Sequence, residues 1–174
     1  MRAIDVRELL EHPGTSRAVH VEEPIEGIGT ELAGVPAERP VEGDLVLEGV
    51  SEGVYVHGSV AAPVRLRCAR CLKEFDERVD VSVAELVPRE AGPEDDYAIA
   101  DDLTIDPEPL VRDAVSLELP FAPLCSPTCA GLCPRCGADR NLEACSCPDA
   151  VDPRWAALEG FTERMDRPDD EDQG

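Results

Sequence analysis

Eight cysteines are the residues of this chain best suited to carry chemistry, because they fall into four close pairs. Two thiolates so near one another can bind one metal ion, and two such pairs make the tetrahedral sulfur site that zinc favours. The sequence therefore predicts two structural Zn²⁺ ions. The predicted ligands are Cys68 with Cys71, Cys125 with Cys129, Cys133 with Cys136, and Cys145 with Cys147.

Four pairs can be divided between two metal sites in three ways. We favour a local site at Cys133–Cys147, because this run is short and its closure costs little entropy. Cys68 and Cys71 then meet Cys125 and Cys129 across about fifty residues and tie two distant segments together. Gly137, directly after the second thiol of its pair, can take the positive φ that such a turn often needs.

A Cys-x-x-Cys pair can instead be a thiol–disulfide couple, so a redox sensor or thiol oxidoreductase is the alternative function. The strand–helix frame of such enzymes is missing from the sequence pattern. All-thiolate zinc sites leave no position for water, and we find no candidate active site, so we expect no enzyme. His12, His20 and His57 lie far from the cysteines, and we expect surface residues rather than ligands.

The formal charge of −22, from 38 acidic and 16 basic residues, argues against a generic nucleic-acid binder. Aromatic residues, at 3%, are also too few for a base-stacking platform. Such a chain suits a basic partner, such as a ribosomal protein, or serves solubility alone. One basic island is present, and it either contacts phosphate or compensates the thiolates; it comprises Arg65, Arg67, Arg70 and Lys73.

Alternating apolar residues over 41–68 and 75–87 predict antiparallel strands, with shorter strands at 18–21 and 99–105. Helices are predicted over 1–12 and from Asp106, an N-cap followed by proline, to about 119. The expected fold class is α+β, with an antiparallel β-sheet, a few helices and a C-terminal cysteine-rich zinc module. The expected domains are a core at 1–122, the zinc module at 123–150, a short helix at 151–160 and a disordered acidic tail at 161–174.

No apolar run approaches the ~20 residues of a membrane span, so no membrane association is expected. The opening residues lack the apolar core of a signal peptide. Thiols without such a signal indicate a reducing compartment, and we expect a cytoplasmic protein.

The cysteine blocks and their flanks together resemble the YceD family of large ribosomal RNA subunit accumulation proteins. The matching segments are Cys68-Ala-Arg-Cys71-Leu72, the run from Pro120 through Cys125 and Cys129 to Gly137, Asn141-Leu142, Cys145-Ser-Cys147, and Asp152-Pro153-Arg154-Trp155. The resemblance implies a role in synthesis, processing or stability of 23S rRNA in bacterial large-subunit biogenesis. It carries over no catalytic residue. Metal binding is inferred from this sequence and is not implied by the family.

The resemblance and the charge together suggest the partner. Genes of the family commonly neighbour that of a small basic large-subunit ribosomal protein, which suggests a shared pathway. We therefore expect the acidic surface to bind a large-subunit ribosomal protein or a pre-ribosomal particle. Direct RNA contact through the basic island is the secondary expectation.

Overall fold

The computed structural model of the protein describes residues 1–148 and 154. Contacts divide the chain into two compact units, Met1–Gly131 and a second unit that begins at Leu132. This grouping places Cys125 and Cys129 with the sheet, whereas the domain prediction put them in a separate module from residue 123. The predicted tail at 161–174, and the predicted helix at 151–160 apart from Arg154, lie outside the described residues.

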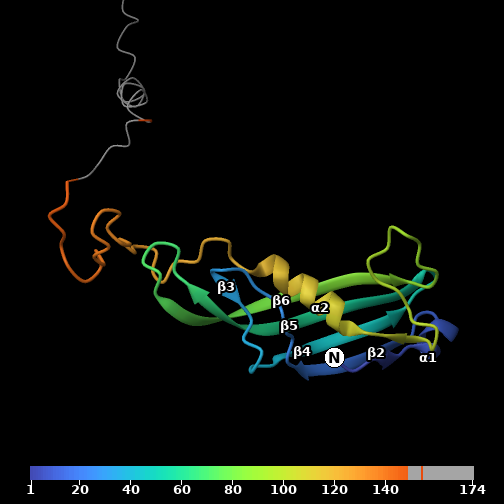
Figure 1. Ribbon diagram of the computed structural model, residues 1–174. Helices are drawn as coiled ribbons and strands as arrows, with labels where there is room; N and C mark the ends of the chain where they lie inside the picture. Colours follow the sequence, from blue (N-terminus) through green and yellow to red (C-terminus); the bar gives the residue numbers. More distant parts are fainter. Residues whose placement is uncertain (149–153, 155–174) are drawn as a thin grey trace, which may run out of the picture. The chain divides into compact units, whose positions relative to one another are not determined.

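The first unit is built on one antiparallel sheet (Figure 1), which confirms the predicted fold class. Its longest strands, β5 and β6, pair along their whole length. The opposite edge of β5 pairs with β4 and then with the short β3, and β4 in turn pairs with β2. The strands are β2 (Ser16–Glu23), β3 (Ala33–Gly34), β4 (Val41–Gly49), β5 (Gly53–Arg67) and β6 (Glu74–Pro88).

Alternation of side chains decides which face of the sheet is buried. In β5, Val54, Val56 and Val60 are at most 2% exposed, while Tyr55 between the first two is 37% exposed. The same period of two buries Val81 and Val83 in β6. One apolar face therefore packs into the core and the other meets water, as the pattern predicted for antiparallel strands.

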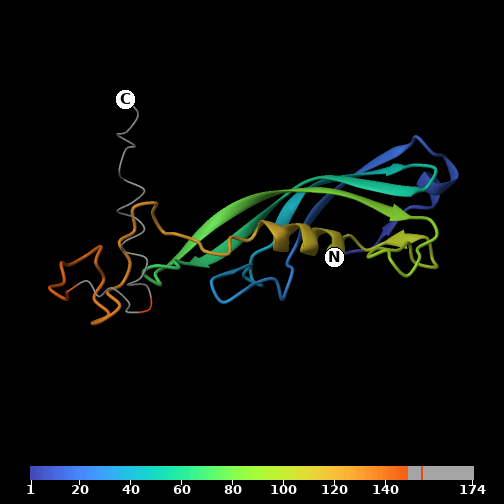
Figure 2. The same ribbon diagram turned by 90° about the horizontal axis from the view of Figure 1, so that it is seen from above.

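Helix α2 (Pro107–Glu118) begins as the sequence predicted. The Asp106 side chain accepts a hydrogen bond of 2.9 Å from the backbone N–H of Glu108, with Pro107 in the first turn. Its apolar stripe, including Leu110 and Val115, is buried, and the helix packs against β6 (Figures 1 and 2).

Two predicted elements, the helix over 1–12 and the strand over 99–105, are shorter in the structure than predicted. The helix predicted over 1–12 is only α1 (Arg7–Glu11), because Ile4 and Asp5 form strand β1 instead. β1 pairs with β7 (Thr104–Ile105). Of the strand predicted at 99–105, only these last two residues are in a strand. Leu103, directly before β7, has a φ of 62°, which is incompatible with extended backbone.

Neither described helix could cross a bilayer, since α2, the longer one within residues 1–148, has only 12 residues.

Candidate metal centres

The first cysteine cluster joins the β5–β6 turn to the segment after α2. Cys68 directly follows β5, Cys71 lies in the turn before β6, and Cys125 and Cys129 follow the helix. Their four Sγ atoms lie within 4.8 Å of one another. The Sγ atoms of Cys68 and Cys129 are 3.8 Å apart, and those of Cys71 and Cys125 are 3.6 Å apart. A tetrahedral zinc with bonds of about 2.3 Å needs sulfurs roughly 3.8 Å apart, so the thiols fit such an ion.

The second cluster lies wholly within the second unit. The Sγ atoms of Cys133, Cys136, Cys145 and Cys147 also lie within 4.8 Å of one another. Cys133 is buried and Cys136 is exposed, so this cluster is the more open of the two. The eight thiols are thus grouped as the sequence analysis favoured, and each group can hold one metal ion.

Both clusters begin with the same local turn. The residue after the second cysteine donates its backbone N–H to the carbonyl of the first cysteine, and the first cysteine donates to the carbonyl two positions beyond the second. The residue directly after the second cysteine has positive φ in both turns: 62° at Leu72 and 75° at Gly137, as predicted for the glycine. The bonds are Leu72 N to Cys68 O, 2.9 Å; Gly137 N to Cys133 O, 2.9 Å; Cys68 N to Lys73 O, 2.9 Å; and Cys133 N to Ala138 O, 2.8 Å.

These turns aim backbone N–H groups at the sulfur of the first cysteine. The amides of Cys125, Cys71 and Arg70 hold the pKa of the Cys68 thiol down to about 6. The amides of Cys136 and Arg135 do the same for Cys133, whose pKa is also about 6. Hydrogen bonding to the charged form favours it, so one thiolate in each cluster is preformed.

In each cluster a second thiol resists ionisation beside that thiolate. The contact with Cys71, together with burial, raises the pKa of Cys125 to about 12. The contact with Cys136 and burial likewise raise the pKa of Cys147 to about 12. Four thiolates cannot share so small a volume unless a cation balances them. The donor set therefore suits a soft or borderline divalent ion.

The segment after α2 is fastened to the β5–β6 turn by more than thiols. The Ala69 backbone N–H donates to the carbonyl of Pro123 at 2.8 Å, and Arg70 Nη1 donates to the carbonyl of Cys129 at 2.9 Å. At Gly131, φ is 73° and an added Cβ would stand 3.0 Å from the carbonyl oxygen of Arg70. Only glycine fits this close approach without displacing the turn.

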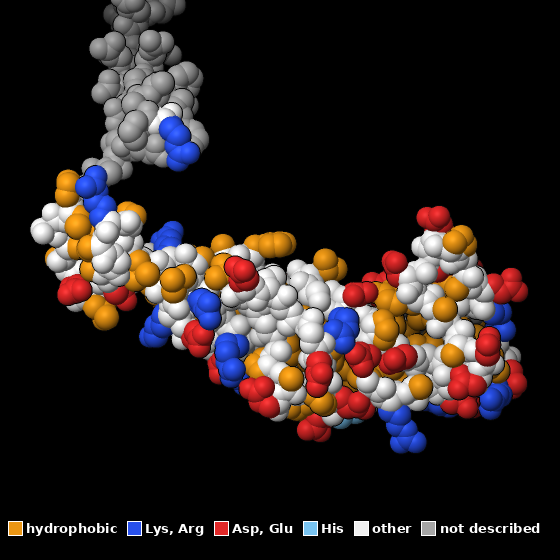
Figure 3. All heavy atoms as spheres, viewed as in Figure 1, with side chains coloured by type: hydrophobic (Ala, Val, Ile, Leu, Met, Phe, Trp, Pro, Cys, Tyr) orange, Lys and Arg blue, Asp and Glu red, His pale blue; other side chains and the backbone are white. Residues whose placement is uncertain are grey.

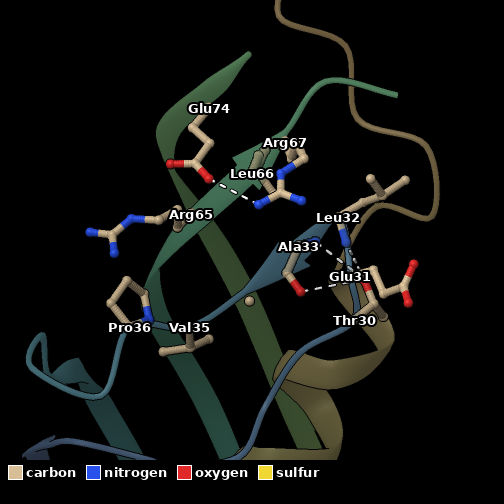
Figure 4. Close-up of a pocket in the computed structure, with 11 residues that line it drawn as sticks. Thr30, Glu31, Leu32, Ala33, Val35, Pro36, Arg65, Leu66, Arg67 and Glu74 are labelled. Atoms are coloured by element: carbon tan, nitrogen blue, oxygen red, sulfur yellow. Dashed lines mark hydrogen bonds and ion pairs between the residues drawn. The ribbon is translucent and has the colours of Figure 1, made fainter. Parts of the chain in front are cut away.

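The basic island is already engaged by acidic side chains within the sheet unit. Arg65 lies 3.4 Å from Asp76 and 3.5 Å from Glu38, and Arg67 lies 3.0 Å from Glu74 (Figure 4). The acidic partners come from β6 and from residue 38, so the sequence of the island alone did not reveal them. Lys73 is the one island residue without an ion pair or side-chain hydrogen bond among residues 1–148 and 154.

A pocket of about 260 Å³ opens beside this island, between the chain at 30–36 and the ends of β5 and β6. Arg65 and Arg67 stand at its rim, and Figure 4 shows Arg67 turned toward Glu74. Because both guanidinium groups have carboxylate partners, the pocket presents no uncompensated positive charge to an anion.

The histidines lie apart from both clusters, as expected. Nδ1 of His20 is 2.9 Å from Asp44 on the exposed face, and this hydrogen bond raises the pKa of His20 above 6.5. The ring of His57 stacks on Tyr55 at 5.2 Å between centroids. Neither histidine belongs to a group of potential metal ligands among the described residues.

Comparison with known proteins places these features in a family. An uncharacterized protein of Mycobacterium bovis and one of Mycobacterium tuberculosis are each 42% identical to this chain over 163 residues, which is 89% of this chain and 78% of the relative. An uncharacterized protein of Mycobacterium leprae is 37% identical over 161 residues, or 88% and 74%. No solved structure matches the chain. Residues 56–162, which include all eight cysteines, match the family described as large ribosomal RNA subunit accumulation protein YceD, and the chain belongs to that family.

Proposed function

We propose that this protein is a non-enzymatic factor in the synthesis, processing or stability of 23S rRNA, acting in large-subunit biogenesis. The observation that carries the proposal is the family match over residues 56–162, whose description names accumulation of the large ribosomal RNA. The fold is compatible with a binding role, since each cluster offers four sulfurs, and a zinc ion held by four thiolates has no open position for substrate.

The cysteine clusters take one structural zinc each in this proposal. Support comes from the four-sulfur donor sets, the sulfur spacing near 3.8 Å in the first cluster and the matching turns. Bound zinc would hold all four cysteines of a cluster as thiolates and would cross-link the two segments that carry its cysteine pairs. A redox couple is the alternative, and it requires accessible thiols that exchange rather than a saturated metal site.

The partner in this proposal is a basic large-subunit ribosomal protein, bound alone or on a pre-ribosomal particle. Acidic side chains are spread over the face shown in Figure 3, and the whole chain carries −22. Such a field attracts a basic protein and repels bare phosphate. Direct RNA contact by Arg65 or Arg67 has less support, because both already pair with carboxylates.

Depletion of the protein in cells tests the proposed function. We expect the ratio of 23S to 16S rRNA to fall and large-subunit particles to decline in sucrose gradients, with recovery when the wild-type gene is restored. An unchanged ratio would remove the ribosomal role.

A binding experiment tests the choice of partner. Immobilised protein should retain purified basic large-subunit proteins at low salt and release them as salt rises, because charge attraction is screened. Reversing Arg65, Arg67 and Arg70 to Glu should leave any RNA association unchanged. Loss of RNA association in that variant, with no retained ribosomal protein, would favour direct RNA binding instead.

A further inference from the structure

The two edges of the sheet differ in how they are protected. Along β2, the N-terminal segment lies against the strand: the Arg2 backbone N–H donates to Glu23 at 3.2 Å, and Arg17 Nη1 donates to the carbonyl of Asp5 at 2.8 Å. At the other edge, β6 pairs with β5 alone, and no other strand within residues 1–148 pairs with it. In Figure 2 the ribbon of β6 has no further strand running along its outer side, and α2 lies on the face of the sheet rather than beyond its edge.

The β5–β6 ladder determines which backbone groups of β6 remain open. Arg89 N donates to Glu52 O, and Cys68 N donates to Lys73 O, each at 2.9 Å, at the two ends of one continuous register. Hydrogen-bonded pairs alternate along an antiparallel ladder, so odd-numbered residues of β6 bond to β5. The even-numbered residues from Glu74 to Leu86 direct their N–H and C=O groups outward.

The side chains of the same even-numbered residues are all exposed. They leave the open backbone accessible to an extended chain, which could bond to it in the manner of one more strand. Near the end of the strand, Leu86 is 44% exposed and lies opposite Tyr55, which is 37% exposed. This pair offers an apolar contact for one side chain of such a segment.

Charge selects the kind of segment that can bind. The first part of β6 is neutralised, since Glu74, Asp76 and Arg78 have partners on neighbouring segments. Further along, Asp80 and Glu85 have no basic group within 4.0 Å among the described residues. The strand as a whole carries five acidic residues and one arginine, so a second copy of β6 would be repelled. A basic segment would be attracted.

We propose that β6, between Arg78 and Leu86, is a docking edge for an extended basic segment of a partner protein, which adds to the sheet as a further strand. The inference rests on the proposed function, because it names the part of a basic ribosomal protein that binds and the place where it binds. Backbone hydrogen bonds supply affinity, and Lys or Arg side chains beside Asp80 on one face of the sheet, or beside Glu85 on the other, supply selectivity.

The first test uses the full-length metal-loaded protein and a synthetic peptide of alternating lysine and valine. The comparison peptide has the same sequence with alternate backbone nitrogens methylated, which removes donors but keeps the charge. We expect the methylated peptide to bind at least about tenfold more weakly, because several backbone hydrogen bonds are lost. We also expect the unmethylated peptide to slow hydrogen exchange at the amides of Asp80, Ser82 and Ala84. Equal affinity for both peptides would overturn the proposal, since charge alone would then explain binding.

Substitutions on β6 give a matched second test. Ser82→Pro removes one outward N–H without removing a ladder bond, a position where edge strands tolerate proline, and Ser82→Ala keeps that N–H. We expect peptide affinity to fall about tenfold in the first variant only. Glu85→Lys should weaken binding more than Glu22→Lys, which makes the same charge change on β2. Equal effects within either pair would refute the assignment. If Ser82→Pro does not fold, the two peptides on the wild-type protein still decide.

The cellular arm separates this inference from the proposed function. If depletion lowers 23S rRNA, Ser82→Pro should fail to restore it while Ser82→Ala succeeds. Full restoration by Ser82→Pro would overturn the docking edge and leave the ribosomal role standing. If depletion leaves 23S rRNA unchanged, the ribosomal role fails, and the peptide results alone judge the edge.

Discussion

Removal of one ligand from each cysteine cluster should have very unequal effects on the sheet. Cys125→Ser and Cys145→Ser form a matched pair, because both thiols are half-buried and each belongs to a different cluster. With zinc bound, the first cluster cross-links Cys71 and Cys125, 54 positions apart. The second cross-links Cys136 and Cys145, which are 145 − 136 = 9 positions apart.

The chain-entropy relation for a cross-link turns these separations into magnitudes. A closed loop of the first size stabilises the folded chain by about 4 kcal/mol, and one of the second size by about 2.5 kcal/mol. Ordinary domains are stable by only about 5–15 kcal/mol, so loss of the first cross-link is a large fraction of the total. The second cross-link lies in the other compact unit, so its loss should leave the unfolding of the sheet unchanged.

Metal analysis combined with urea unfolding provides the assay. We expect two zinc ions per chain in the wild type and one in each variant. Followed by far-UV circular dichroism, the sheet should unfold at lower urea in Cys125→Ser and at the wild-type midpoint in Cys145→Ser. Equal midpoints despite the loss of one metal from each variant would refute the reasoning. If Cys125→Ser does not fold, stepwise chelation of the wild-type protein should show the same coupling between metal and sheet.

Four further substitutions probe the core, an exposed control position, a turn and a surface pair. Leu66→Ala, at a side chain 2% exposed, should lower the free energy of unfolding by about 2–5 kcal/mol, whereas Leu117→Ala, at one 85% exposed, should change it by less than about 0.5 kcal/mol in the same urea titration. Gly137→Ala should cost roughly 1 kcal/mol from its φ of 75° alone, since nothing crowds the added Cβ, and competition with a chelator should show weaker zinc binding. Asp44→Asn should return the pKa of His20 toward 6.5 in an NMR titration. Because the pair raises that pKa, the stabilisation it gives is complete below pH 6.5 and is lost as pH rises through the pKa of the folded state. A His20 pKa that is the same in the variant and the wild type would contradict the pairing.

The grouping of the cysteines was predictable because it depends on chain separation. A short run such as Cys133–Cys147 closes on itself at little entropic cost, and the remaining pairs then have only each other. The start of α2 was predictable for a similar local reason. Asp106 and Pro107 satisfy and preset the first turn whatever the helix later packs against.

The fate of the basic island was not predictable from its own residues. Arg65 and Arg67 lie opposite Asp76 and Glu74 only because the β5–β6 turn sets that register. A turn longer or shorter by one residue would have changed every pairing and moved the acidic side chains to the other face. The alternation of basic residues in 65–67 and of acidic residues in 74–76 was the available signal. This alternation shows which residues pair only once the register of β5 against β6 is known.

The start of the chain shows how tertiary contacts override local propensity. Ile4 fits the apolar side of a helix over 1–12, yet it pairs with Ile105, which is 105 − 4 = 101 positions away. Val6 donates to the carbonyl of Leu103 at 2.9 Å, which holds this pairing in place. A two-stranded contact between distant segments leaves no periodic trace in either segment, so the local pattern favoured the helix.

The first cysteine cluster lies directly before the start of β6, so its metal ion and the open edge of that strand are structurally linked. Cys68 closes the end of β5, and its N–H bonds to Lys73, the residue directly before β6. A metal ion at this cluster therefore fixes the start of β6, an edge strand that pairs on one side only within residues 1–148. Without the ion, the first residues of β6 lose their anchor to the segment after α2 and can fray, because edge strands unfold locally before central ones. Docking of a strand on β6 and metal binding at the first cluster both stabilise the same folded edge, so each should strengthen the other. Removal of the metal by a chelator should accordingly weaken binding of the lysine–valine peptide, whereas the Cys145→Ser substitution should leave that binding unchanged.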